Sequence, residues 1–459
     1  MQLFVLSPDT PEAEGPHLHV ANLTLGLQAQ PLDPSPSPAP FICISYSWGT
    51  GRTPSPFCPS ELVSDRTIPA LHAVLTQRPL SRAFWVDAFC VPGLDSPAER
   101  AATLESMGFI YSRAEEVIVV LTGRALPALE QIGREENLLP SHLDALERED
   151  WVTRAWTYQE AVNARRLRVT CHDAPPGVLV DCLQLFSYLG HAINSLGVEE
   201  RSSKHPRLNA FEDVMVDCAV AMYLERSALQ VMAIMDERTQ TRVEDHFYAM
   251  MGAISTEPAA SVVREAKSPC EAFMALCEKK GDYSFVFSSV GRDAREGRRW
   301  RPVEDERLPA ILRLSSRGSG LRGRADGDKV VVEDVVVFRP GPISDDSRGF
   351  VARWLEGYKP ARSYADLELE HAAFEALCEM GFTGSSECVE TNDGLFFPQT
   401  RLGDASELEI IVAVGIEWRL GSPALGRYQK DDSAGGVLYT PGVFFGILPE
   451  GHCGETVIL

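Results

Sequence analysis

The sequence predicts an α/β fold: a parallel β-sheet flanked by helices, followed by a mainly helical region and a β-rich carboxyl-terminal domain. Short apolar runs at 41–46, 84–91 and 116–121 are rich in β-branched and aromatic residues, as is typical of strands buried on both faces. The segments between these runs have helical periodicity. After residue 290, similar runs are separated by turn residues instead of helices.

At 459 residues the chain is too long for a single hydrophobic core, so we expect several domains. Residues 1–40 are expected to hold edge strands and a connector, because prolines at 31, 34, 36, 38 and 40 exclude a helix there. We place the parallel-sheet domain at 41–175, the mainly helical region at 176–290 and the β-rich domain at 291–459.

Within the parallel-sheet domain, helices are expected between the strands. The segment Ser96–Glu99 contains an N-cap serine, a proline at the first helical position and a first-turn glutamate, which predicts a helix start. An apolar stripe at helical spacing follows in Leu104, Met107, Gly108 and Tyr111. An acidic helical insertion is expected at 126–150 and a fourth strand at 168–171. Open sheets of this kind bind ligands beyond the carboxyl ends of their strands.

Four segments of the helical region have apolar residues at helical spacing, namely 178–196, 210–224, 227–235 and 270–280. A further helix is expected within 238–252, with Gly252 as its C-cap. In the β-rich domain, strands are expected at 330–332, 335–338, 410–414 and 443–448, and a helix at 364–379.

The composition excludes several classes of protein. A net charge of −22 disfavours nucleic acid as a partner, because phosphate binding needs a positive surface. Five arginines between 292 and 301 are interpreted as a solvated loop. No apolar run approaches the ~20 residues that span a bilayer, and no secretory signal precedes the first strand, so we expect a cytoplasmic protein without a membrane span.

The cysteines predict no disulfide framework and no zinc site. Eleven cysteines are scattered without a C-x-x-C pair, and Cys43, Cys90 and Cys277 fall within apolar stretches, so we expect reduced thiols that serve as small core residues. His17 and His19 are interpreted as a surface pair, and no metal is expected.

Four motifs occur in order in the first domain: SYSWG at 45–49, WVDAFCV at 85–91, FIYSRAEEVIVVL at 109–121 and WVTRAWTYQEAV at 151–162. Together they resemble the heterokaryon-incompatibility (HET) domain over residues 41–165, and four ordered motifs are far more specific than one. The chain departs from the family pattern at Val91–Gly93 and in its own loop at 50–65.

HET domains are in turn similar to TIR domains, so the resemblance implies a TIR/flavodoxin-like sheet. It also places Glu160 where enzymatic TIR domains carry the glutamate that cleaves NAD⁺. NAD⁺ would be the substrate, and no separate cofactor is expected. The bond to nicotinamide breaks through a ribosyl cation, which a nearby carboxylate stabilises.

The resemblance and the residue chemistry suggest roles for the neighbours of Glu160. Trp156 lies one helical turn earlier, on the same face. Tyr46 or Trp48 can stack on a ring, and backbone N–H groups from Ser45 to Gly49 can cradle phosphate. Arg154 is expected either to reach a phosphate or to pair with Asp87.

Each assignment has a structural alternative. Tryptophans are commonly core anchors, and a helical glutamate such as Glu160 is ordinarily exposed. Asp87, which we place in an apolar strand, either faces a cleft or is satisfied internally by a donor such as Arg154.

Two functions therefore remain open. The first is an NAD⁺-consuming NADase of an innate immunity or incompatibility pathway that triggers cell death, activated by self-association or a partner protein, with residues after 175 sensing the trigger. The second is a non-enzymatic HET signalling module that acts by self-association, in which the motif residues are structural.

Overall fold

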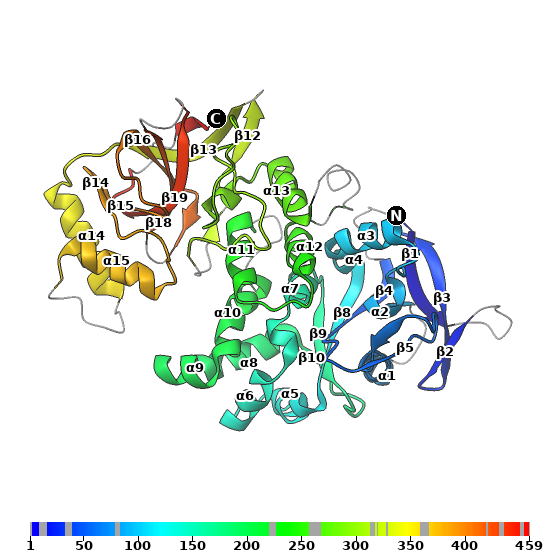
Figure 1. The fold of residues 1–459 in the computed structure, drawn as a ribbon. Coiled ribbons are helices and arrows are strands. Elements are labelled where there is room, and N and C mark those ends of the chain that lie inside the picture. Colours follow the sequence, from blue (N-terminus) through cyan, green and yellow to red (C-terminus); the bar gives the residue numbers. More distant parts are fainter. Residues whose placement is uncertain are drawn as a thin grey trace. The chain divides into compact units, whose positions relative to one another are not determined.

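The computed structural model describes residues 2–8, 16–32, 39–78, 83–219, 226–255, 257, 268–312, 317–318, 320–326, 329–358, 367–418, 421–430, 436–449 and 454–458. The chain divides into two compact units. One contains Met1–Tyr223 and Glu237–Ser261, and the other contains Leu224–Asp236 and Val262–Leu459 (Figure 1). The chain therefore returns to the first unit after it has entered the second.

The sheet of the first unit has the strand order β10-β9-β8-β4-β7-β1-β3-β2. Its centre is formed by β4 (Ala39–Tyr46), β7 (Ala83–Trp85), β8 (Ala114–Leu121) and β9 (Leu167–Cys171), which pair in parallel. The parallel sheet and its fourth strand are thus confirmed. The strands run together because their apolar side chains are buried on both faces.

Antiparallel strands extend both sides of this sheet. β1 (Gln2–Pro8) pairs with β7, β3 (Leu23–Pro31) follows it, β2 (His17–Val20) is at the edge, and β10 (Val180–Asp181) pairs with β9. The amino-terminal strands are confirmed, but only β2 is an edge strand, because β1 and β3 lie inside the mixed sheet. Residues 33–38 of the expected connector lie outside the described residues.

The expected second strand is too long. β7 ends at Trp85, and the next residues form the short helix α2 (Asp87–Cys90). The N–H groups of Phe89 and Cys90 donate to the carbonyl oxygen of Val86, which closes a helical turn. Because α2 buries Phe89 and Cys90, it is as apolar as a strand, so composition did not separate the two.

The helix predicted from Ser96 is confirmed as α3 (Pro97–Glu105), although the Ser96 side chain makes no capping bond. It breaks at Ser106, and α4 (Met107–Arg113) follows. Tyr111 of α4 packs edge-to-face on Trp85 at 5.4 Å between ring centroids. On β4, Cys43 pairs with Trp85, so Cys43 and the next side chain on its face, Ser45, point toward α4.

Three helices cross at glycines on this face. Gly108 of α4 lies against Gly252 of α12 (Val243–Ile254), and a Cβ added to Gly108 would be 2.1 Å from the Gly252 carbonyl oxygen. Asn163, which follows α7 (Ala155–Val162), donates to the same carbonyl at 2.6 Å. Gly252 is therefore inside the helix, and its predicted role as C-cap is wrong: it permits close packing.

The remaining helices include the predicted ones, whereas the helices at Val198–Lys204 and Asp345–Tyr358 were not predicted. In the first unit they are α1 (Thr67–Gln77), η1 (Gly123–Ala125), α5 (Leu126–Gly133), α6 (Pro140–Glu147), η2 (Asp150–Thr153), α8 (Cys182–Asn194), α9 (Val198–Lys204) and α10 (Pro206–Ala219). In the second they are α11 (Ala228–Asp236), α13 (Pro269–Lys280), η4 (Ser284–Phe287), α14 (Asp345–Tyr358) and α15 (Leu369–Glu379). The predicted helical residues 220–224 and 364–366 lie outside the described residues.

The second unit confirms the β-rich carboxyl-terminal part. Its sheet has the order β12-β13-β16-β18-β19-β15-β14, and β20 also pairs with β13. The strands are β12 (Gly323–Asp326), β13 (Lys329–Phe338), β14 (Val389–Thr391), β15 (Gly394–Pro398), β16 (Ala405–Ala413), β18 (Ser422–Lys430), β19 (Leu438–Gly446) and β20 (Gly454–Ile458). Pro340, just beyond β13, bridges Thr391 of β14, which closes the sheet into a small barrel. Small strand pairs are β5 (Arg52–Pro54) with β6 (Leu62–Ser64), and β11 (Arg317–Gly318) with β17 (Ile416–Glu417).

The arginine-rich segment near 300 is not simply a solvated loop, contrary to the prediction. The Arg301 side chain is 3% exposed and pairs with Glu271 and Glu278, and Arg292 donates to three backbone carbonyls. Cys43, Cys90 and Cys277 are buried, as predicted. No helix in the described part of the chain is long and apolar enough to cross a membrane.

Candidate functional site

The predicted site residues lie at the carboxyl end of β4, at the start of α2 and along α7. β4 ends at Tyr46, and Gly49 then adopts φ +60°, a conformation that favours glycine. Asp87 is the first residue of α2, and Arg154 is the N-cap of α7. Helices that connect parallel strands begin at the edge where the strands end. Residues distant in sequence therefore meet here.

Glu160 is buried, which contradicts the expectation for a helical glutamate. Its residue exposure is 5%, and Ser45 Oγ donates to Glu160 Oε2 at 2.5 Å. Ser45 Oγ in turn accepts from Trp151 Nε1 at 2.7 Å. This chain joins β4, η2 and α7 by hydrogen bonds between buried side chains.

The environment of Glu160 favours its neutral form. Burial raises the pKa of the Glu160 carboxyl from 4.5 to about 8, and the negative charge of Asp87 acts in the same direction. The hydrogen bond from Ser45, the Tyr111 hydroxyl and the positive charge of Arg154 oppose this increase in pKa. At pH 7 most Glu160 side chains therefore carry a proton.

Asp87 is satisfied by donors other than Arg154. Trp48 Nε1 donates to Asp87 Oδ2 at 2.7 Å, and the Ala88 N–H donates to Oδ1 at 2.7 Å. Burial raises the pKa of Asp87, and these two donors and Tyr46 oppose the increase. Trp48 is thus anchored through its indole N–H, while its ring remains partly exposed.

Tyr46 points away from Ser45, because neighbouring residues of a strand face opposite sides of the sheet. Its hydroxyl is 2.7 Å from Thr67 Oγ1 at the start of α1, and it also influences the pKa of Asp87. Tyr46 and Ser45, the partner of Glu160, therefore lie on different faces of β4. Asp87 interacts with both Tyr46 and Glu160 at the edge of the sheet.

Arg154 is a partly exposed cation beside these two carboxyls. Its positive charge lowers the pKa of both Asp87 and Glu160. No described residue makes a hydrogen bond or ion pair with its guanidinium group. Its backbone is held firmly, since the Arg154 carbonyl accepts from Arg238 Nη1 at 2.6 Å.

Residues 238–252 complete the surroundings of the site; the sequence singled this segment out but did not indicate its contacts with the site. Thr239 exchanges backbone hydrogen bonds with Thr153 and Ala155, at 2.7 and 2.9 Å. Trp156 lies nearly parallel to Tyr248 of α12, with 6.4 Å between ring centroids and 14° between planes. The sequence pattern predicted the helix α12 but none of these contacts.

The structure thus brings together Ser45, Trp48, Asp87, Arg154 and Glu160, with Tyr46 at the same edge. Gly49 instead lies against Arg66, and Trp156 against Tyr248. No group of three or more potential metal-ligating side chains occurs among the residues that the structure describes.

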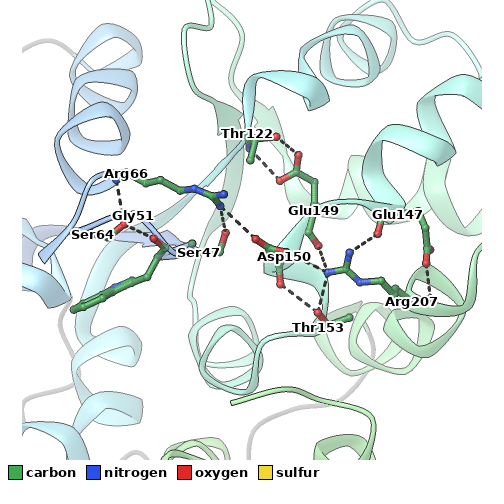
Figure 2. A network of polar contacts seen from close by, with 12 residues as sticks. Ser47, Gly51, Ser64, Arg66, Thr122, Glu147, Glu149, Asp150, Thr153 and Arg207 are labelled. Carbon is green, nitrogen blue, oxygen red and sulfur yellow. Dashed lines mark hydrogen bonds and ion pairs between the residues drawn. The ribbon is translucent and has the colours of Figure 1, made fainter. Parts of the chain in front are cut away.

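A second polar network lies next to this edge and involves residues that the sequence did not single out. Figure 2 shows Asp150 of η2 between the guanidinium groups of Arg66 and Arg207. Glu149 accepts from the Thr122 N–H at 3.0 Å and from Thr122 Oγ1 at 2.5 Å. Thr122 directly follows β8, so this network also lies at the carboxyl ends of the strands.

Comparison with known proteins places the first unit in a family context. Residues 41–160 match the family described as Heterokaryon incompatibility protein (HET). The match ends at Glu160. It includes the candidate site residues from Ser45 to Glu160 but not Arg238, Thr239 and Tyr248. No curated protein and no solved structure matches the chain.

Proposed function

We propose that the protein is a heterokaryon incompatibility effector that triggers cell death by cleaving the nicotinamide–ribose bond of NAD⁺ at Glu160. Water adds to the ribosyl carbon, so the products are nicotinamide, ADP-ribose and a proton. The HET match over 41–160 supports the role in incompatibility. The TIR-like chemistry is our own extension of that match.

One observation supports the chemistry most directly: two interacting carboxyl groups and an unpaired guanidinium lie together at the ligand-binding edge of a parallel sheet. A positively charged ribose beside Glu160 would favour the ionised carboxylate and lower its pKa, which stabilises the transition state. Arg154 is free to bind a substrate phosphate.

The burial of Glu160 implies regulation in this proposal. At 5% exposure the carboxyl is closed to substrate, and most of it is protonated at pH 7. Self-association or an activating partner protein would open the site and expose Glu160 to NAD⁺. The resting protein would then leave cellular NAD⁺ intact.

The same burial favours a second candidate function. The hydrogen-bond chain from Trp151 through Ser45 to Glu160 joins three elements of the core. In a non-enzymatic HET module this chain would be structural, and signalling would depend on self-association alone.

The Glu160→Gln variant separates the two functions. If Glu160 cleaves NAD⁺, nicotinamide release by the assembled protein should fall about 10²-fold or more, because one electrostatic contact to the transition state is lost. Glu130→Gln on α5 is the control, since Glu130 forms a surface ion pair with Arg134 and lies outside the site. Parent-level release by folded Glu160→Gln would refute the enzymatic role, and unchanged self-association would then favour the module.

A further inference from the structure

The network in Figure 2 contains two fixed arginines that share one carboxylate. Arg66 Nη1 is 3.5 Å from Asp150 Oδ2, and Arg207 Nη2 is 3.7 Å from Asp150 Oδ1. The side chains of Arg66, Arg207 and Asp150 are 30%, 32% and 50% exposed. A solute can therefore reach all three.

Arg66 is held in place by the loop that follows β4. Its Nη1 donates to Ser47 Oγ at 3.1 Å. Gly49 lies directly against it, because an added Cβ would be 2.6 Å from Arg66 Nε. This close approach and the positive φ of Gly49 shape the loop around the guanidinium group.

Arg207 is fixed by the backbone of the segment before α7. Its Nη1 donates to the Glu147 carbonyl at 2.8 Å, and its Nη2 donates to the Glu149 carbonyl and to Thr153 Oγ1, each at 3.0 Å. Side chains that are already ordered lose little entropy when a ligand binds. Both guanidinium groups are preorganised in this sense.

Asp150 neutralises this pair incompletely. Charge-assisted hydrogen bonds have typical lengths of about 2.7–2.9 Å, and both contacts of Asp150 are longer. Glu149 is occupied by Thr122, and burial raises its pKa. The positive charge of Arg66 still acts on His172, whose pKa is lowered by burial and then by Arg66.

We propose that Arg66 and Arg207 bind a phosphate group of a small organic phosphate or diphosphate, and that Asp150 is an internal counter-ion which the phosphate displaces. A phosphate offers more acceptor oxygens than one carboxylate and matches the planar donors of arginine. Its place at the ends of β4 and β8 agrees with the ligand edge of parallel sheets. Binding here does not require Glu160, so this inference goes beyond the proposed function.

The test is calorimetric titration of the full-length protein with inorganic pyrophosphate at low ionic strength. Arg66→Ala should weaken binding about tenfold or more, because hydrogen bonds to a charged group are lost. Asp150→Asn should strengthen it severalfold, because the competing negative charge is removed while the side-chain shape is kept. Arg134→Ala is the matched control, an exposed arginine that pairs with Glu130 on α5, and should not change the affinity.

Equal affinities of the parent, Arg66→Ala and Asp150→Asn would overturn the proposal, as would weaker binding by Asp150→Asn. If Arg66→Ala fails to fold, Arg66→Lys provides the same comparison, since it keeps the charge and removes the planar donors. Pyrophosphate binding that survives in Glu160→Gln would separate this site from the fate of the NAD⁺ proposal. Conversely, NAD⁺ cleavage without Arg66-dependent pyrophosphate binding would reject only the phosphate site.

Discussion

The two sheets of this protein use polar residues in opposite ways. The sheet of the first unit is parallel at its centre and collects Ser45, Asp87 and Glu160 at one edge. The barrel of the second unit is antiparallel, and its core cluster consists of Phe338, Phe396, Ile410, Val412, Ala424 and Phe444. Among the described residues, the polar ones buried on its strands are hydroxyl residues such as Thr391 and Thr440, not carboxyl groups. Parallel strands bring all their carboxyl ends to one side, whereas antiparallel strands do not.

The sheet of the second unit therefore contributes mainly stability, whereas the sheet of the first unit also holds groups that can do chemistry. In the barrel, Gly442 makes room for the Phe396 ring, since an added Cβ would be 2.4 Å from Phe396 Cε2. Phe338 and Phe444 stack at 4.7 Å between centroids. In the first unit, by contrast, the Glu160 carboxyl is buried, and its ionisation there destabilises the folded protein. A buried carboxyl with a raised pKa at the edge of the sheet where ligands bind is a candidate functional group.

The largest expected effect is in the barrel. Phe396→Ala should lower the free energy of unfolding of the second unit by about 3–5 kcal/mol, because a fully buried ring is replaced by a cavity. Chemical denaturation measures the change. Val337→Ala on β13 is the control, at 39% exposure, and should cost much less. Similar losses in both variants would contradict an apolar, closely packed barrel.

The helix crossing of the first unit comes next. Gly108→Ala should destabilise it by about 1–3 kcal/mol, because the new Cβ meets the backbone of Gly252 and the helices must separate. Gly190→Ala on α8 has no atom within 4 Å of the added Cβ and should instead stabilise the helix by about 0.5–1 kcal/mol. Thermal unfolding of both variants checks the contrast, and a harmless Gly108→Ala would disprove the close crossing.

A pH effect should distinguish the first unit from the barrel. The folded-state pKa of Glu160 is raised to about 8, so the folded protein binds more protons than the unfolded one between pH 4.5 and 8. Stability from this group is therefore greatest below pH 4.5 and falls as the pH rises to about 8. The slope is at most about 1.4 kcal/mol per pH unit.

Glu160→Gln should remove this slope, so that the variant becomes more stable relative to the parent as the pH rises. Phe396→Ala, in the barrel, should keep the parent slope. Denaturation curves collected from pH 5 to 9 give the comparison. An identical pH dependence of stability in the parent and in Glu160→Gln would show that the pKa of the Glu160 carboxyl is not raised.

The smallest effect is expected for surface charges. Arg324 pairs with Glu333 of β13 and with Glu455 of β20, but its side chain is 51% exposed. Arg324→Ala should change the free energy of unfolding by less than about 1 kcal/mol, because water and salt screen such pairs. Denaturation at low and high salt tests this. A salt-independent loss larger than that of Gly108→Ala would mean that β20 depends on these pairs.

Much of the fold was predictable because it depends on local pattern. Apolar runs identified β4 and β8, proline and serine identified the start of α3, and branched runs identified β13, β16 and β19 but not the other barrel strands. The strand–helix order indicated that Ser45 to Gly49, Asp87 and Glu160 lie near one edge of the sheet. The edge of the sheet, and with it the region of the site, could therefore be predicted from the sequence. The strand–helix order did not indicate that Tyr46 and the Ser45–Glu160 pair lie on opposite faces of β4.

The sequence by itself thus determined the parallel centre of the first sheet, most of the helices around it and the HET motifs, since periodicity and turn residues act over a few positions. Only the tertiary structure decided which polar groups are buried and which partners they contact. Glu160 is buried because Ser45, 115 residues earlier, supplies its donor. Gly252 is a packing residue because Gly108 lies against it, and Arg66 and Asp150 approach each other across 84 residues. Such contacts depend on which surfaces meet, and local periodicity contains no information about that.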